Sequence, residues 1–513
     1  KAVLPFIMWT QNTIMALLDQ QIKELIKAPL NLPSLRKAIQ QEQRLKFHSQ
    51  IVNDSKEVSP YYRDYLKWVN SFLTATDKFQ RFKNIFSFPV QTNDLIDSIA
   101  DEHSKVFESN NSFFDYQLSS PELKADFIDY LNHLKLDEFF KTSVFNCIYG
   151  AINSILIVDL PLLQDGDYSS PYVYILDIDK VIDLSVDSDG KIKYIIFNYG
   201  KNQIAVFDEL SYRLYTKDDK GNIFNTVNSI HTLGYCPAQF LWDGSLNNNN
   251  RIVKESPISA SVSALDWLLF VQTGKKSLDI YAAYPIYWGF ESDCDYKNEE
   301  GNKCEGGYTN YGLGTDSAHQ RICPTCDSKK IIGPGSYIAV PPPRPGRSDD
   351  PDLRNPVGVV PAEDKSLNYN TTEEDRLKKR IYENCTGKGS ESVNKQALNE
   401  DQVNSQFESR KAILQYISKN LSVAHTWVVD TIGRLRYDDS FISSSINYGT
   451  EFYLQTIESA VNDYANAKKN GLPGYIIAEK RKLIQDLQTK NNPNSKTRLQ
   501  ILEILEPYTD LSP

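Results

Sequence analysis

The sequence predicts an α+β protein that is mainly helical, with an antiparallel β meander and two helices separated by an insertion. Three observations lead to this prediction. Apolar residues recur at helical spacing toward both ends of the chain. Between them, residues 154 to 215 alternate with the period of two that is typical of strands. Two further helical patterns, between residues 251 and 437, flank a segment with four cysteines and a run of prolines.

Composition limits the classes of function. The chain has 513 residues, enough for several domains, and 41% of them are hydrophobic, as in ordinary globular proteins. The net charge of −10 argues against a protein that grips nucleic acid through a basic surface, but it is compatible with one that encloses DNA. The most apolar N-terminal stretch, residues 2–18, is too short and too polar to span a membrane, so we expect no membrane partner.

Residues 1–153 are predicted to form a helical layer. Apolar residues at heptad-like spacing support this, namely Leu17, Ile22, Ile26, and then Tyr62, Tyr65, Leu66, Val69 and Phe72. Ser120 followed by Pro121 predicts a helix start, because serine caps a helix and proline suits its first position.

Residues 154–250 are predicted to form the antiparallel sheet. The expected strands are 155–159, 172–176, 192–197, 204–207 and 213–215. Asp189-Gly190 and Lys220-Gly221 indicate turns between them. The acidic segment 187–190 lacks the remaining ligands of a calcium loop, so we interpret it as a hairpin turn.

The two helices around the insertion are expected at 251–284 and 371–384. The first would start at Ser256-Pro257 and end before Pro285. The second would start with the capping-box pattern of residues 371–374. The insertion itself, 285–370, ends in a loop-like stretch rich in proline, aspartate and asparagine from residue 344 onward.

The C-terminal part is predicted to be helical again. A polar loop at 385–400 contains Lys388 and Lys395 and reads, without further context, as a solvated connection. A long helix is expected at 401–437, with apolar residues at 403, 407, 414, 417, 421, 424, 428, 432 and 435. Residues 438–513 are expected to add further helices.

The four clustered cysteines are the strongest chemical signal. They are Cys294, Cys304, Cys323 and Cys326, and the last two form a Cys-Pro-x-Cys knuckle whose backbone amides favour thiolates. A structural zinc ion held by all four would stabilise an insertion that has little core of its own. The nine-residue gap between the first two is wider than usual, and His319 is a spare ligand. Unliganded thiols and disulfides are the alternatives.

No enzyme motif is complete, so we expect no catalytic activity. Lys388 and Lys275 each follow a glycine, but Tyr382 and Leu269 occupy the positions where a phosphate-binding loop needs its first glycine. Four cysteines around a metal would leave no open position for catalysis.

In its order of elements the chain resembles the portal proteins of tailed bacteriophages. The residues that carry the resemblance are Tyr149-Gly150-Ala151 before the first strand, His231-x2-Gly234-x2-Pro237, Glu255-Ser256-Pro257-Ile258, Tyr284-Pro285-Ile286 and Gly333-Pro334-Gly335-Ser336-Tyr337-Ile338. The match extends from about Phe114 to Tyr437. The composition, rich in Asn, Lys and Tyr, is compatible with a crAss-like gut phage.

The resemblance implies a portal-like fold. Its parts would be a helical wing (1–153), a wing sheet (154–250), an outgoing stem helix (251–284), a clip (285–370), a returning stem helix (371–384), a tunnel loop (385–400), a long wing helix (401–437) and C-terminal helices toward the crown (438–513). The clip departs from the family pattern, because it carries the cysteine cluster and a proline-rich return.

The resemblance also implies the function and the partners. Such a chain forms a ring, a homododecamer in this family, at one capsid vertex of the virion, after assembly in the cytoplasm of the bacterial host. Double-stranded DNA passes through its channel without sequence-specific contact, and Lys388 and Lys395 would face that DNA. The partners would be the terminase motor, the major capsid protein and the adaptor or tail proteins. The alternatives are a cellular zinc-stapled scaffold or binding protein and a zinc-ribbon nucleic-acid enzyme.

Overall fold

The structure is a computed structural model of the chain. It describes residues 17–49, 60–109, 111–161, 168–218, 220–247, 250–290, 294–305, 307–314, 318–328, 337–340, 357–360, 364–387, 400–452, 457–489, 498–499 and 501. The predicted α+β class is confirmed, with 55% helix against 22% strand. Among the helices of these residues, none combines the length and the apolar character that crossing a membrane requires.

The chain divides into two compact units. Unit 1 contains residues 1–50, 94–261 and 382–513, and unit 2 contains residues 51–93 and 262–381. The helices of residues 60–85, which the sequence analysis placed in the N-terminal layer, therefore group with the two helices around the insertion.

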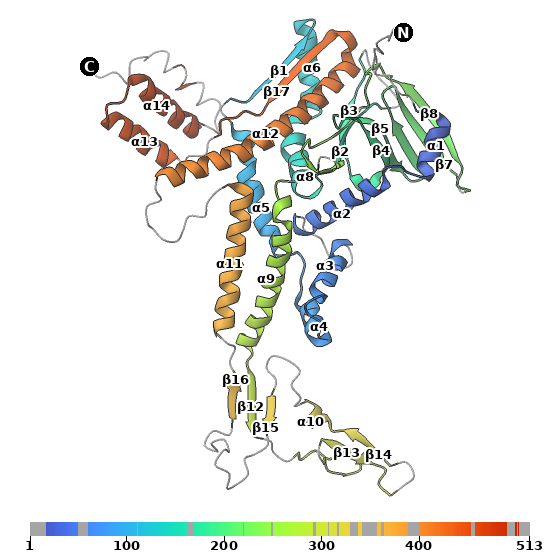
Figure 1. Ribbon diagram of the computed structural model, residues 1–513, viewed down its shortest axis with the longest axis vertical. Coiled ribbons are helices and arrows are strands. Elements are labelled where there is room, and N and C mark those ends of the chain that lie inside the picture. Colours follow the sequence, from blue (N-terminus) through green and yellow to red (C-terminus); the bar gives the residue numbers. More distant parts are fainter. Residues whose placement is uncertain are drawn as a thin grey trace, which may run out of the picture. The chain divides into compact units, whose positions relative to one another are not determined.

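Unit 1 is built on two sheets (Figure 1). The smaller has the order β3-β2-β9, with β2 (Ile155–Asp159), β3 (Tyr172–Leu176) and β9 (Ala238–Phe240). The larger is a five-stranded meander of β4 (Val181–Val186), β5 (Ile192–Gly200), β6 (Gln203–Phe207), β7 (Ser211–Lys217) and β8 (Ile223–Ile230). The predicted strands are confirmed, but β4, β8 and β9 were not predicted. Gly190, with φ +86°, lies in the predicted turn between β4 and β5.

Two helices cover opposite faces of the meander. Along β5, Ile195 joins the core that includes Leu35 of α2 (Leu32–Ser49), whereas Ile196 joins the core that includes Ile22 of α1 (Asp19–Lys27). Successive residues of a strand point to opposite faces, so β5 is buried on both sides.

Further helices precede the sheets. They are α5 (Thr92–His103), α6 (Pro121–His133), α7 (Leu136–Phe139) and α8 (Phe145–Gly150), with a π-helical turn at Phe140–Val144. The predicted start of α6 is confirmed, because the backbone N–H of Leu123 donates to Oγ of Ser120.

A further sheet in unit 1, of two strands, corrects the helical predictions for residues 1–153 and 438–513. In it, β1 (Phe113–Leu118) pairs antiparallel with β17 (Phe441–Asn447). The side chain of Asp430 accepts hydrogen bonds from the backbone N–H and the hydroxyl of Ser444, which attaches β17 to the preceding helix. The pairing joins segments more than 300 residues apart, so local periodicity carries no sign of it.

The predicted long helix is α12 (Glu400–Tyr437). Its apolar stripe is buried at Leu414, Ile417, Leu421, Ala424, Val428 and Ile432. Two helices, α13 (Ile457–Lys469) and α14 (Gly474–Thr489), follow and pack on each other. The remaining unit 1 strands, β10 (Ser245–Asn247) and β11 (Asn250–Lys254), form a hairpin.

Unit 2 contains α3 (Pro60–Asn70), α4 (Thr76–Ile85), α9 (Val262–Ala283) and α11 (Asp364–Thr386), of which the last five residues belong to unit 1. The predicted start of the first helix was wrong, because the hydroxyl of Ser256 donates to the carbonyl of Ile148 and α9 begins six residues later. The second start was also wrong. Thr371 lies inside α11, where its hydroxyl donates to the carbonyl of Leu367.

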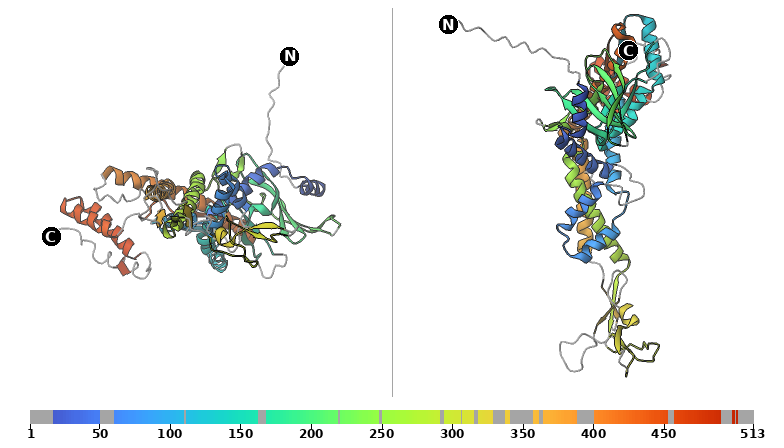
Figure 2. Two further views of the ribbon diagram at one scale, coloured as in Figure 1. Left: turned by 90° about the horizontal axis from the view of Figure 1, so that it is seen from below. Right: turned by 90° about the vertical axis from the view of Figure 1, so that its right-hand side faces the viewer.

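Two helices run side by side in unit 2, α9 and α11 (Figures 1 and 2). Glu374 of α11 is 8% exposed and accepts hydrogen bonds from Lys275 Nζ at 3.0 Å and from Gln272 Nε2 at 3.4 Å, both on α9. On another side of α9, Tyr61 of α3 donates to Asp266 at 2.8 Å.

The insertion between α9 and α11 contains two small sheets. The first has the order β15-β12-β16, formed by β12 (Ile286–Phe290), β15 (Tyr337–Val340) and β16 (Val357–Val360). Its β12–β15 pair is parallel and its β12–β16 pair is antiparallel, so this small sheet is mixed, unlike the antiparallel meander of residues 154–250. The second is the hairpin of β13 (Tyr308–Tyr311) and β14 (His319–Ile322), followed by the short helix α10 (Pro324–Ser328).

Candidate metal centre

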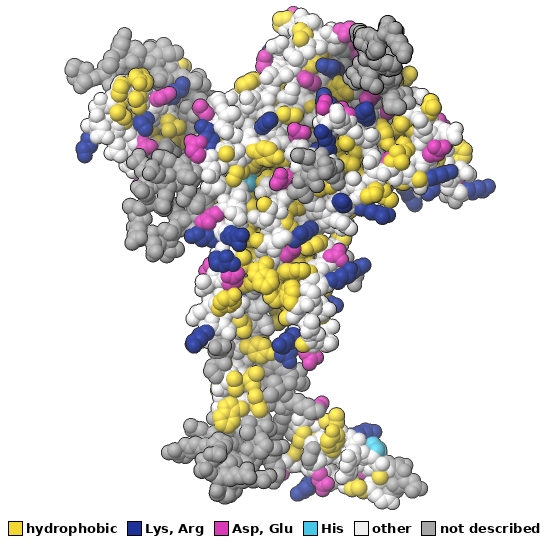
Figure 3. Space-filling view, in the orientation of Figure 1, with side chains coloured by type: hydrophobic (Ala, Val, Ile, Leu, Met, Phe, Trp, Pro, Cys, Tyr) yellow, Lys and Arg dark blue, Asp and Glu magenta, His cyan; other side chains and the backbone are white. Residues whose placement is uncertain are grey.

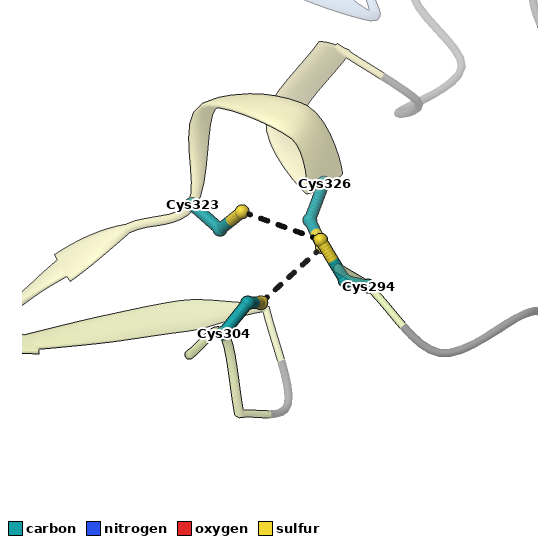
Figure 4. A group of neighbouring side chains, drawn as sticks. All are labelled: Cys294, Cys304, Cys323 and Cys326. Carbon is teal, nitrogen blue, oxygen red and sulfur yellow. Dashed lines mark hydrogen bonds between the residues drawn. The ribbon is translucent and has the colours of Figure 1, made fainter. Parts of the chain in front are cut away.

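Three short backbone segments bring the four cysteines of the insertion together (Figure 4). Cys294 and Cys304 lie at the two ends of a loop that precedes β13. Cys323 follows β14 directly, and Cys326 lies in α10. The predicted cluster is therefore assembled from a loop, a strand end and a helix, each contributing one or two thiols.

Asn298 organises the loop between the first two cysteines. It is 6% exposed, and its side-chain oxygen accepts hydrogen bonds from the backbone N–H groups of Glu300 and Asn302. Its side-chain amide donates to the carbonyl of Asn310 on β13 at 2.7 Å. The loop folds back on itself, and the backbone N–H of Cys304 donates to the carbonyl of Tyr296. This explains how nine intervening residues still bring the first two thiols together.

The second pair sits on the predicted knuckle. The backbone N–H of Cys323 donates to the carbonyl of Gly307 at 2.9 Å, which anchors the knuckle to the start of β13. Pro324 then opens α10, and the N–H of Asp327 donates to the carbonyl of Cys323 at 2.8 Å. Gly307 has φ +89°, a conformation that glycine adopts without strain.

The four sulfur atoms form a compact group. All lie within 4.8 Å of one another. The Sγ atoms of Cys294 and Cys323 are 3.7 Å apart, and those of Cys304 and Cys326 are 3.6 Å apart. Sulfurs at about 2.3 Å from a tetrahedral zinc ion lie about 3.8 Å from each other. A disulfide needs about 2.05 Å, so the thiols are free and already spaced for a metal ion.

Burial and hydrogen bonds set unequal acidities for the thiols. Burial opposes ionisation of Cys323, which is fully buried, but the backbone N–H of Cys326 and neighbouring thiols outweigh it and lower the pKa of Cys323 to about 7. Burial, together with the other three thiols, raises the pKa of Cys326 to about 12. Burial also raises the pKa of Cys304, although the thiol of Cys326 opposes this shift. A bound divalent cation would lower the pKa of all four thiols, because it favours the thiolate form of every ligand.

The other predicted site residues lie elsewhere. His319 is exposed on β14, where its ring stacks on Tyr311 with centroids 5.6 Å apart, and it is not part of the cysteine group. Cys147, Cys236 and Cys385 belong to unit 1. Lys388 and Lys395, the predicted DNA-facing residues, lie outside the described residues.

The donor set fits a closed metal site. Four thiols offer four ligand atoms and leave no position for a water or a substrate, which is the pattern of structural rather than catalytic sites. Asn298, which the sequence analysis missed, supplies the supporting hydrogen bonds. The sequence does indicate a turn here, because residues 298 to 302 are rich in turn-forming residues. In the structure Gly301 of this turn has φ +81°.

No protein-family model matches the chain, and a comparison with curated proteins finds no match.

Proposed function

We propose that this chain is a portal protein of a tailed phage, forming a ring at one capsid vertex through which double-stranded DNA is packaged and ejected. The observation that carries the proposal is the pair of helices α9 and α11 with an insertion between them. Together with the resemblance of residues 114–437, this arrangement supports a stem made of the two helices and a clip made of the insertion.

Strand pairing supports the stem and clip. The chain leaves α9 at Ala283 and enters β12 at Ile286, and it returns through β16, ending at Val360, into α11 at Asp364. Ile286 pairs directly with Val360, so the outgoing and returning segments remain neighbours beyond the helices. A clip connected by two paired strands would be held firmly at the end of the stem.

Exposed aromatic residues in unit 2 support assembly into a ring. Trp68 and Phe72 of α3 and Trp267 of α9 are 36%, 41% and 39% exposed. Trp68 contacts both others, with ring centroids 4.9 Å from Phe72 and 6.1 Å from Trp267. Apolar side chains also gather on the surface near α9 in Figure 3. Exposed aromatic clusters are typical of surfaces that another chain covers.

The ion at the cysteine centre is proposed to be zinc. Four thiolates at tetrahedral spacing suit Zn²⁺, which needs no redox chemistry and stabilises small domains. In the clip such an ion would hold a docking surface for the terminase and later for the adaptor or tail proteins. It would have no catalytic role, and the absence of a complete phosphate-binding motif in the sequence agrees with a ring that leaves ATP hydrolysis to the motor.

The DNA contact is proposed to be weak and independent of sequence. A net charge of −10 would let a duplex slide instead of binding it tightly. Lys388 and Lys395 remain the proposed contacts of the tunnel loop. The major capsid protein would surround the ring in the virion.

The mass of the purified full-length chain tests this proposal. A ring of about twelve chains of 58.5 kDa weighs about 700 kDa. Native mass spectrometry should find such an oligomer, with one zinc ion per chain. A stable single chain with zinc bound would instead support a zinc-stapled scaffold, and a metal-dependent nuclease activity would support an enzyme.

A further inference from the structure

Unit 1 contains a cavity that the proposed portal function does not use. Its volume is about 560 Å³, within the range of small-molecule sites. One wall is α12, which contributes Trp427 and Asp430, and the other is β9 with the turn between β4 and β5. Lys254, the last residue of β11, also lines it.

Lys254 is buried and its backbone is fixed. The residue is 2% exposed. Its backbone N–H donates to Oδ1 of Asn153 at 2.7 Å, and its carbonyl accepts from Nε2 of Gln41 at 2.8 Å. The side chain therefore starts from an anchored position at the cavity.

The amino group of Lys254 has few partners for a buried cation. Nζ donates one long hydrogen bond, of 3.4 Å, to the carbonyl of Asp243, and it lies 4.3 Å from the centre of the Phe240 ring. None of the ion pairs found in the described part of the chain includes it. Burial, with a smaller contribution from Arg251, lowers the pKa of Lys254 to about 8, although Asp243 opposes the shift.

The side chains that line the cavity determine which kind of molecule could bind next to Nζ of Lys254. Phe240 and Trp427 offer aromatic surface, whereas the carboxylates of Asp189, Asp243 and Asp430 disfavour anions. An uncharged carbonyl compound with an apolar body suits both features. We propose that Lys254 is a covalent capture site for small uncharged aldehydes, aromatic ones above all.

The chemistry is the condensation of an amine with an aldehyde. The lone pair of unprotonated Nζ attacks the carbonyl carbon and gives a carbinolamine, which loses water to leave an imine. Amine and aldehyde thus become imine and water without any oxidant. The imine nitrogen takes up a proton from water, and sodium cyanoborohydride then delivers hydride to the imine carbon, which traps the adduct as a secondary amine.

Labelling of the intact chain tests the proposal. The protein is incubated with benzaldehyde and cyanoborohydride at pH 7.4, and the modified lysines are quantified by peptide mass spectrometry. Lys191 is the matched control, because it is exposed and lines the same cavity. An amine with a pKa near 8 is mostly protonated at this pH, but far less so than an ordinary lysine at about 10.4, so we expect Lys254 to react at least about tenfold faster than Lys191.

Two further measurements distinguish specific aldehyde capture by Lys254 from the labelling of any accessible lysine. Labelling of Lys254 should rise with pH and level off above about pH 8. The Lys254→Arg variant keeps a positive charge and should lose the adduct at this position, while Lys191 reacts as before. Equal labelling of Lys254 and Lys191 in the unmodified protein would overturn the proposal. So would labelling of Lys254 that keeps rising well above pH 8.

Discussion

At the scale of single residues, the cysteine centre combines one fully buried ligand with three half-buried ones. Cys323 is held by the backbone of Gly307, and Asn298 holds the loop that carries the first two thiols. These hydrogen bonds position the segments that carry the four thiols, whose sulfur atoms lie within 4.8 Å of one another. Removing one ligand should therefore affect metal binding more than it affects the rest of the protein.

Substitution of the buried ligand tests the centre. We expect Cys323→Ser to lower the zinc content from about one ion per chain to near zero and to increase amide hydrogen exchange across residues 294–328. The control is Cys147→Ser, which changes a half-buried thiol in unit 1 and should keep the metal. Elemental analysis of reduced protein gives the stoichiometry, and metal-free wild-type protein would contradict the assignment.

The buried carboxyl group of Glu42 should make the free energy of unfolding depend on pH. Glu42 is 3% exposed on α2, and burial raises the pKa of its carboxyl group from 4.5 to about 7, against the attraction of Lys46 and the N–H of Asn153. Between these two values the folded state binds the proton that the unfolded state has released. The free energy of unfolding should therefore fall as pH rises from 4.5 to 7, by at most about 1.4 kcal/mol per pH unit.

The Glu42→Gln variant should flatten this pH dependence, because glutamine stays uncharged and can still accept the hydrogen bond from Asn153. Glu122→Gln, on the exposed first turn of α6, serves as the control and should leave the slope unchanged. Urea unfolding at several pH values measures the slope. An unchanged slope in Glu42→Gln would contradict this account of the buried carboxyl.

At the scale of elements, the contact between α12 and β17 depends on one glycine. A Cβ added at Gly433 would lie 2.3 Å from the ring of Phe441, at the start of β17. Gly274, in α9, has nothing within 4 Å of the same position. Both are helical glycines, so they differ chiefly in their surroundings.

Alanine at these two positions should act in opposite directions. Gly433→Ala should destabilise unit 1 by about 1–3 kcal/mol, because the ring of Phe441 must move. Gly274→Ala should stabilise α9 by about 0.5–1 kcal/mol, because alanine is the better helix former. Thermal unfolding and local hydrogen exchange measure both effects. A Gly433→Ala variant as stable as the unmodified protein would disprove the close contact between residue 433 and Phe441.

Elements whose residues carry their own periodic or apolar pattern could be predicted from the sequence. The apolar stripe of α12 and the short run of β-branched and other apolar residues in β2 are local signals, and both elements were predicted. Features that depend on contacts between residues far apart in the chain could not be predicted. The hydroxyl of Ser256 donates a hydrogen bond to the carbonyl of Ile148, and this serine does not start a helix. Strand β1 forms only by pairing with β17. The four ligands were found because cysteine chemistry is specific, whereas Asn298 was missed because its role depends on β13.

At the scale of the whole molecule, both units would contribute to one structure, the proposed portal ring. The paired helices α9 and α11 would form the stem, the insertion with its cysteine centre would form the clip, and unit 1 would form the wing. The aromatic residues Trp68, Phe72 and Trp267 would be covered by a neighbouring chain. These roles require that several copies of the chain assemble in a closed ring.

Electron microscopy of the negatively stained full-length protein tests the ring most directly. If the chain forms a portal, we expect class averages of closed rings with a central opening and about twelve repeats. Particles of the size of one chain, at concentrations where the protein remains folded and zinc-loaded, would contradict it.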